Sequence, residues 1–175
     1  MIDNITVEMA CSVNGIIARE NGEEDFLLER GWDIMLEFLE NEYDALVWGR
    51  KTFENIKKWG KKYISDLNDY NIFVLSNKDI EYNMENVIVV NSIDKLLDLA
   101  EKMGLKKLFV SGGAKTNNEF MKKGIVDTLI LNYNPYVLNK GINLFEGDEF
   151  EYKLNLQEVR KEKDGIIQVK YSVKK

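Results

Sequence analysis

Short apolar runs typical of strands alternate along this chain with segments whose apolar residues recur at helical spacing. The strand-like runs are residues 5–10, 44–48, 71–75, 87–90, 107–110 and 126–132. The helical segments are residues 26–41, 52–58, the stretch between Ser92 and Gly104, and residues 117–123. This alternation predicts an α/β fold with a mostly parallel, twisted central sheet flanked by helices.

The carboxyl-terminal part follows a different pattern. Residues 150–160 and 166–175 both alternate with strand period, and Lys163-Asp164-Gly165 lies between them. An Asp-Gly pair between two such runs is typical of a β-hairpin, so an antiparallel edge is expected here. A chain of 175 residues buries about 70% of its unfolded surface. We therefore expect one domain over residues 1–175.

Charge and missing residue types exclude several kinds of function. The net charge of −6 is the wrong sign for nucleic-acid or anionic-membrane binding. Because the chain has no histidine, Ser-His-Asp and Cys-His catalysis and His-ligated zinc are excluded within it, and no metal site is expected. The single cysteine, Cys11, suits a reducing cytosol, and no signal or anchor segment is visible. A cytoplasmic location is expected.

The most informative junction is Val110-Ser111-Gly112-Gly113-Ala114, where an apolar strand runs through two glycines into a helix. Main-chain N–H groups and the helix dipole converge at such a place, and glycine lets a pyrophosphate approach closely. The alternative is an ordinary tight turn between a strand and a helix.

Two other strand ends carry similar groups. Gly49-Arg50-Lys51-Thr52 adds two cations and a hydroxyl at a helix start, and Leu75-Ser76-Asn77-Lys78 adds a hydroxyl, an amide and a cation. Each has a plainer reading as a helix cap or a solvated turn. The carboxyl ends of parallel strands meet at one edge of an open α/β sheet, so these strand ends together predict one groove for an anionic ligand.

Two further segments have less specific patterns. The loop Ser12-Val13-Asn14-Gly15 leaves the first strand between small and apolar residues and could lie against a flat ring, although Asn-Gly marks turns in many settings. This makes Asn14 a candidate substrate contact. The basic run over residues 57–62 is expected to be a solvated loop that at most steers an anion.

Taken in order, these stretches resemble the dihydrofolate-reductase-like superfamily, most closely the reductase domain at the carboxyl end of the riboflavin-biosynthesis deaminase-reductase. The residues that carry the resemblance lie in 12–18, 44–53, 74–76, 109–113, 124–129, 134–135 and 141–145. The resemblance implies a reductase that binds NADPH and commonly forms homodimers.

The resemblance also implies roles for individual positions. The nicotinamide would lie between Ala10 and Ile17. The phosphates would meet the backbone and side chains of Gly49, Arg50, Lys51, Thr52, Gly112, Gly113 and Ala114. The adenosine end would meet Leu75 and Ser76, with Ser76 and Lys78 near the 2′-phosphate.

Some family features are missing from the sequence. The segment after the first loop, residues 20–26, lacks the Trp-x-Leu-Pro of folate reductases, and Ser111 stands where riboflavin-pathway reductases usually carry an acid. No zinc deaminase domain occurs within these residues. These departures count against folate reduction and against a direct role in the riboflavin pathway, and the chain resembles a free-standing relative of that branch.

The predicted function is transfer of a hydride from NADPH to a C=N or C=O bond of a small pterin-type, pyrimidine-type or ribosyl substrate. Asp25 is the preferred proton donor because it precedes the first helix near the nicotinamide loop, with Glu23, Glu24, Tyr133 and solvent as alternatives. Three other functions stay open: a nucleotide-binding module without turnover, a dihydrofolate reductase, and a plain α/β interaction domain.

Overall fold

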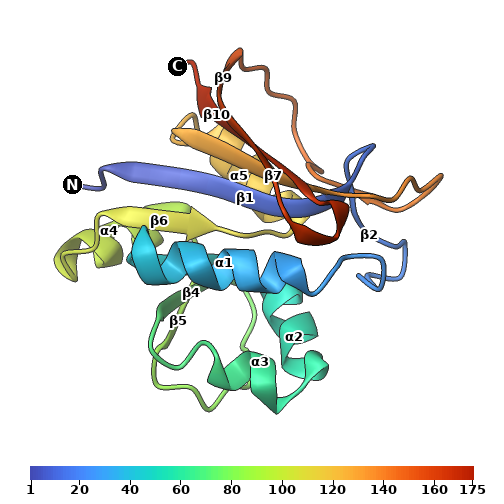
Figure 1. The fold of residues 1–175 in the computed structure, drawn as a ribbon. Coiled ribbons are helices and arrows are strands. Elements are labelled where there is room, and N and C mark those ends of the chain that lie inside the picture. Colours follow the sequence, from blue (N-terminus) through green and yellow to red (C-terminus); the bar gives the residue numbers. More distant parts are fainter.

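An eight-stranded sheet forms the centre of the protein in a computed structural model of residues 1–175 (Figure 1). The strands run in the order β5-β4-β3-β6-β1-β7-β10-β9. Their bounds are β1 Asn4–Ser12, β3 Ala45–Gly49, β4 Asn71–Leu75, β5 Val87–Val90, β6 Lys107–Val110, β7 Thr128–Asn134, β9 Leu154–Lys161 and β10 Ile167–Val173. Two short strands, β2 Ile16–Ala18 and β8 Ile142–Asn143, form a separate small sheet.

The strand directions confirm the predicted fold class. Across the sheet, every neighbouring pair among β5, β4, β3, β6, β1 and β7 is parallel, whereas β10 is antiparallel to both β7 and β9. The carboxyl ends of β1, β3, β4 and β6 consequently meet at one edge. The edge strand β9 and its neighbour β10 form the predicted hairpin, whose turn is helped by the left-handed φ of +59° at Asp164 and +82° at Gly165.

The helices cover both faces of the sheet (Figure 1). They are α1 Arg30–Asn41, α2 Arg50–Trp59, α3 Lys61–Ser65, α4 Ile93–Lys102 and α5 Ala114–Lys122, with a 3₁₀ turn η1 at Lys163–Gly165. Successive strand residues point to opposite faces, so Leu46 and Phe109 pack with α1 and α2, whereas Val47 and Val110 pack with α4 and α5. The central strands are apolar on both faces for this reason.

Several predicted boundaries are wrong. Helix α1 begins at Arg30 rather than at Phe26, because the preceding residues form turns and the Leu28 N–H donates to Asn134 Oδ1 at 3.0 Å. Helix α5 begins three residues earlier than predicted, directly after Gly113. The basic run over residues 57–62 is the end of α2 and the start of α3 rather than a loop, since Tyr63 packs against the tryptophans of neighbouring helices.

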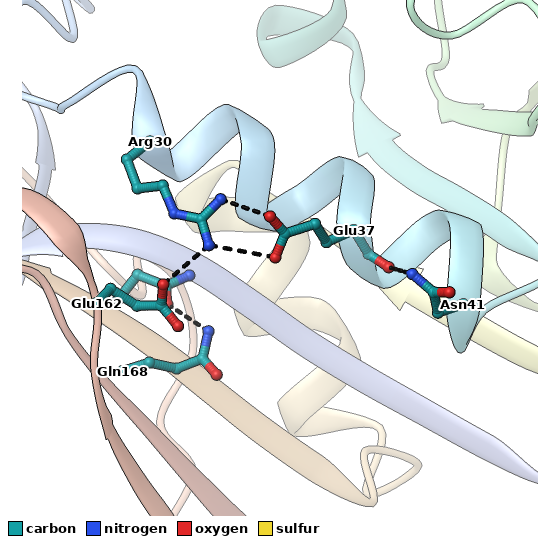
Figure 2. Close-up of polar contacts among 6 residues, drawn as sticks. Arg30, Glu37, Asn41, Glu162 and Gln168 are labelled. Atoms are coloured by element: carbon teal, nitrogen blue, oxygen red, sulfur yellow. Dashed lines mark hydrogen bonds and ion pairs between the residues drawn. The ribbon is translucent and has the colours of Figure 1, made fainter.

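A shared arginine connects α1 to the hairpin (Figure 2). The Arg30 guanidinium donates to Glu37 on its own helix, at 2.5 and 3.2 Å, and to Glu162 beside η1 at 2.9 Å. The Arg30 guanidinium holds the pKa of Glu37 below its usual value. In the same view Gln168 of β10 lies close by, and its amide donates to Asn132 on β7 at 2.8 Å.

We expect Glu162→Gln to lower the free energy of unfolding by about 1 kcal/mol, because it removes the negative charge from a partly buried ion pair. Glu158→Gln is the matched control, since Glu158 pairs with Arg160 on the exposed surface of the same hairpin. Urea unfolding followed by fluorescence measures both. Equal losses in the two variants would show that the Arg30 link adds nothing beyond an exposed pair.

Candidate functional site

A cavity of about 1290 Å³ lies along the sheet edge where the parallel strands end. Most of the predicted cofactor residues line it, and they come from six helices and strands and the loops beside them. They are Ala10, Ile17, Gly49, Arg50, Lys51, Thr52, Leu75, Ser76, Gly113 and Ala114. Gly112 does not line the cavity but forms the bend beneath it. The structure therefore brings these residues to one place, as the strand topology predicts.

Two helices begin at the cavity with no side chain capping them. Gly49 is the N-cap of α2 and Gly113 is the N-cap of α5, and neither helix start has a side-chain hydrogen bond. Helix α4 differs, because the Ser92 hydroxyl accepts from the Lys95 N–H. Free N–H groups and the positive ends of two helix dipoles thus converge on one cavity, which is a favourable arrangement for binding phosphates.

The glycines at these junctions fit closely. A Cβ on Gly49 would lie 2.3 Å from Thr116 Oγ1, and one on Gly112 would lie 2.8 Å from Met9 Sδ. Gly112 has a φ of +90°, and its carbonyl accepts from the Gly49 N–H at 2.8 Å. The peptide bond between Gly112 and Gly113 is cis. One bend therefore connects the starts of α2 and α5.

The cations along the cavity differ in availability. The Arg50 guanidinium donates to both carboxylate oxygens of Glu54 at 2.8 Å, so its charge is already balanced. Lys51, Lys78 and Lys115 line the cavity without an ion-pair partner. These three lysines are free to meet an anion.

The side chain of Ser76 takes part in a local turn. Its hydroxyl donates to the Lys78 carbonyl at 2.7 Å and accepts from the Lys78 N–H at 3.0 Å. This turn places Lys78 at the end of β4.

Asn14 and Asp25 lie apart from the other predicted residues. The Asn14 side chain accepts from Ser12 Oγ and donates to the Leu138 carbonyl, which holds the loop closed outside the cavity. Asp25 is exposed and pairs with Arg19 at 2.5 Å, and this guanidinium keeps the pKa of Asp25 below its usual value. An exposed carboxylate held in its charged form makes a poor proton donor, so this geometry does not favour the choice of Asp25.

The neighbouring residue Glu24 has the opposite environment. It lines the cavity, makes no ion pair, and burial raises its pKa to about 7. A carboxyl with this pKa holds a proton near neutral pH. Of the four side chains considered from the sequence, Glu24 is therefore the one placed to donate a proton inside the cavity.

Another carboxyl in the cavity, Glu8, is buried and was missed in the sequence. It lies on β1 at 3% exposure and lines the cavity. Ser111 Oγ donates to Glu8 Oε2 at 3.0 Å, and Asn132 Nδ2 donates to Oε1 at 2.5 Å. Burial raises the pKa of Glu8 to about 7 even though these hydrogen bonds lower it. The missed signal is an acid in the middle of an apolar strand, on the same face as Ala10.

The sheet order and the edge cavity define an α/β protein with a dihydrofolate-reductase-like fold. A candidate riboflavin biosynthesis protein from Shewanella sp. PV-4 superimposes with a TM-score of 0.79 at 24% identity over 98% of this chain and 99% of that one. The Thermotoga maritima diaminohydroxyphosphoribosylaminopyrimidine deaminase/5-amino-6-(5-phosphoribosylamino)uracil reductase gives a TM-score of 0.73 at 16% identity, over 99% of this chain and 57% of that one.

Sequence comparison identifies the family. The model of the RibD C-terminal domain matches residues 3–168, so this chain belongs to the RibD C-terminal domain family. The Bacillus subtilis (strain 168) protein YwjB is 30% identical over 154 residues, which cover 85% of this chain and 86% of YwjB. The resemblance stated from the motifs is confirmed.

Two other properties of the structure bear on function. None of the helices has both the length and the apolar character needed to cross a membrane. No group of three or more His, Cys, Asp or Glu side chains is arranged to hold a metal ion.

Proposed function

We propose that this protein is an NADPH-dependent reductase that transfers a hydride to a C=N or C=O bond of a small heterocyclic substrate. The observation that carries this proposal is the pair of uncapped helix starts, α2 and α5, which face one cavity through Gly49 and Gly113. A Cβ would lie 2.3 Å from Thr116 Oγ1 at Gly49 and 3.1 Å from Thr52 Oγ1 at Gly113. Membership of the RibD C-terminal domain family supports it, because the family is reductase-like.

The residues present fit such a dinucleotide. The starts of α2 and α5 would hold the pyrophosphate through their N–H groups, with Lys51 and Thr52 beside them. Lys78 and Lys115 would meet the 2′-phosphate end. Ala10 and Ile17 would flank the nicotinamide. When bound, the dinucleotide supplies the hydride.

The chain's own residues would orient the reacting groups and supply the proton. The protein orients the reacting groups, which is the main contribution that a fold makes to hydride transfer. Glu24 would hold a proton at the cavity wall for the substrate nitrogen or oxygen, because its pKa is raised to about 7. Asn134 fixes the chain just before α1 through the Leu28 N–H, so that α1 closes the cavity over the sheet.

Thermal stabilisation tests the binding part of this proposal. We expect NADPH at 100 times its dissociation constant to stabilise the folded protein by about 2.7 kcal/mol. Oxidation of NADPH with a panel of pterins and pyrimidines, followed by absorbance, then tests turnover. Stabilisation without turnover would favour a binding module, and no stabilisation by either NADPH or NADH would overturn the proposal.

The three unpaired lysines predict a preference for NADPH over NADH. We expect Lys78→Gln to reduce this preference about tenfold, because it removes a charge-assisted contact to the 2′-phosphate while leaving the pyrophosphate site intact. Lys106→Gln is the matched control, since Lys106 lies outside the cavity. Titration calorimetry with both dinucleotides measures the ratio. An unchanged ratio in Lys78→Gln would place the 2′-phosphate elsewhere.

The resemblance also implies a homodimer, and this stays a prediction. Sedimentation equilibrium on the purified chain measures it directly.

A further inference from the structure

The lining cations are confined to one part of the cavity. They come from the start of α2, the turn after β4, and α5 with the residue that follows it, and they are Arg50, Lys51, Lys78, Lys115, Lys122 and Lys123. Carboxylates occur in both parts: Glu54, Asp94, Glu119 and Glu146 lie on α2, α4, α5 and the segment after β8, whereas β1 and the loop between β2 and α1 contribute Glu8, Glu20, Glu24 and Glu29 and no cation. The cation-rich part coincides with the proposed dinucleotide site. The remaining part, which we call the acidic compartment, lies between α1 and the sheet.

An aromatic cluster forms one wall of the acidic compartment. Trp32 of α1, Trp59 at the end of α2 and Tyr63 of α3 line the cavity and meet edge to face, with ring centroids 5.0 to 6.0 Å apart. Trp32 is fixed by a 3.1 Å hydrogen bond from Nε1 to Asp66 Oδ2, and Trp59 is 42% exposed. Such a wall favours a flat, apolar or cationic ligand.

Glu8 forms the polar group on the sheet side of the compartment. It lies on the same face of β1 as Ala10, and Ser111 and Asn132 fix its position. The Asn132 amide is fixed in turn by Gln168. A carboxyl oxygen held in this way keeps lone pairs for an N–H of a ligand.

The basic run next to the compartment contributes no cation to its wall. Lys57 donates to the Glu81 carbonyl and Lys62 pairs with Glu29 at 2.9 Å, and no lysine of residues 57–62 lines the cavity. Arg50 is engaged by Glu54. The compartment therefore has no unpaired cation for a phosphate.

We propose that the acidic compartment takes a planar nitrogen heterocycle that carries no phosphate and is uncharged or cationic. The ring would pack on the cluster of Trp32, Trp59 and Tyr63 and direct an N–H toward Glu8. A phosphate carries up to two negative charges, and burying it where no cation lines the wall is unfavourable. This inference rests on the proposed reductase function and narrows its substrate. It also separates this chain from the Thermotoga maritima protein, whose name specifies a phosphoribosyl compound.

The test compares riboflavin with riboflavin 5′-phosphate, because the two share one planar ring system and differ only in the phosphate. Binding to the full chain is followed by quenching of tryptophan fluorescence and by calorimetry, with and without NADP⁺. We expect riboflavin to bind at least about tenfold more tightly than its phosphate. Equal affinities, tighter binding of the phosphate, or binding of neither compound would overturn the inference.

A pair of variants locates the binding. We expect Trp59→Ala to weaken riboflavin binding about fivefold to tenfold, while Trp59→Phe keeps most of it. Stabilisation by NADPH should be the same in both, because Trp59 lies in the acidic compartment. Unchanged riboflavin binding in Trp59→Ala would overturn the placement.

The dinucleotide measurement keeps the two proposals apart. If NADPH stabilises the protein and riboflavin shows no advantage over its phosphate, only the substrate inference fails. If riboflavin is preferred and NADPH gives no stabilisation, the reductase proposal fails and the selectivity of the compartment stands.

Discussion

Replacing Gly112 by alanine is expected to destabilise the fold by about 2 kcal/mol and to weaken NADPH binding at least about tenfold. The φ of +90° at Gly112 is unfavourable for any residue with a Cβ, and that Cβ would lie 2.8 Å from Met9 Sδ. The Gly112 carbonyl also accepts from the Gly49 N–H. A shift of this bend therefore displaces the starts of both α2 and α5, where the phosphates are expected.

Gly104→Ala is the matched control for this experiment. Gly104 also has a positive φ, of +76°, but a Cβ there would meet nothing within 4 Å. We expect it to lose about 1 kcal/mol of stability through the backbone alone, with NADPH affinity unchanged. Chemical unfolding and calorimetry measure the two quantities separately. NADPH affinity like that of the wild type in folded Gly112→Ala would contradict the role of the bend.

The parts of the fold that local sequence signals determine were predicted well. The predicted strands at 71–75, 87–90 and 107–110 have the same first and last residues as β4, β5 and β6, because polar residues on either side of a short apolar run define where the strand begins and ends. The Ser92 cap of α4 was also predicted, because the capping hydroxyl acts three residues away. The strand-end ligand site followed from topology, as parallel strands bring their carboxyl ends together.

The acidic groups of the site could not be predicted in the same way. The environment of Glu8 depends on Ser111, Asn132 and Gln168, which are more than 100 residues away along the chain and meet only when β1, β6, β7 and β10 pair. The choice of proton donor between Asp25 and Glu24 depends on the ion pair of Asp25 with Arg19, and the fold of the loop determines that ion pair. The small helix α3 depends on aromatic packing across elements and has no strong local signal.

The Glu8→Gln variant should change how stability depends on pH. Burial raises the pKa of Glu8 to about 7, whereas in the unfolded chain a glutamate titrates near 4.3. Between about pH 4.3 and pH 7 the folded state keeps a proton that the unfolded state has lost, so the free energy of unfolding falls as pH rises. The contribution of this group is fully present at low pH and is lost by about pH 8, a change of about 4 kcal/mol.

A glutamine removes that titration and keeps the hydrogen bonds. Its Oε1 can accept from Asn132, and its Nε2 can donate to Ser111 Oγ. We therefore expect Glu8→Gln to be about 1 kcal/mol more stable than the wild type at pH 5 and about 4 kcal/mol more stable at pH 8. Urea unfolding at several pH values measures this difference.

The difference in the free energy of unfolding between Glu8→Gln and the wild type reports on Glu8 and not on the other titrating groups. Glu24 also has a pKa raised to about 7, but it is present in both proteins and its contribution cancels. Tyr43 and Cys11, whose pKa values Glu8 helps to raise, both reach about 12 and stay neutral over this range. Glu158→Gln, at an exposed carboxyl, should differ from the wild type by the same amount at pH 5 and pH 8. If Glu8→Gln behaved in that way too, Glu8 would be an ordinary carboxylate in the folded protein, and the proton assigned to it in the cavity would have to lie elsewhere.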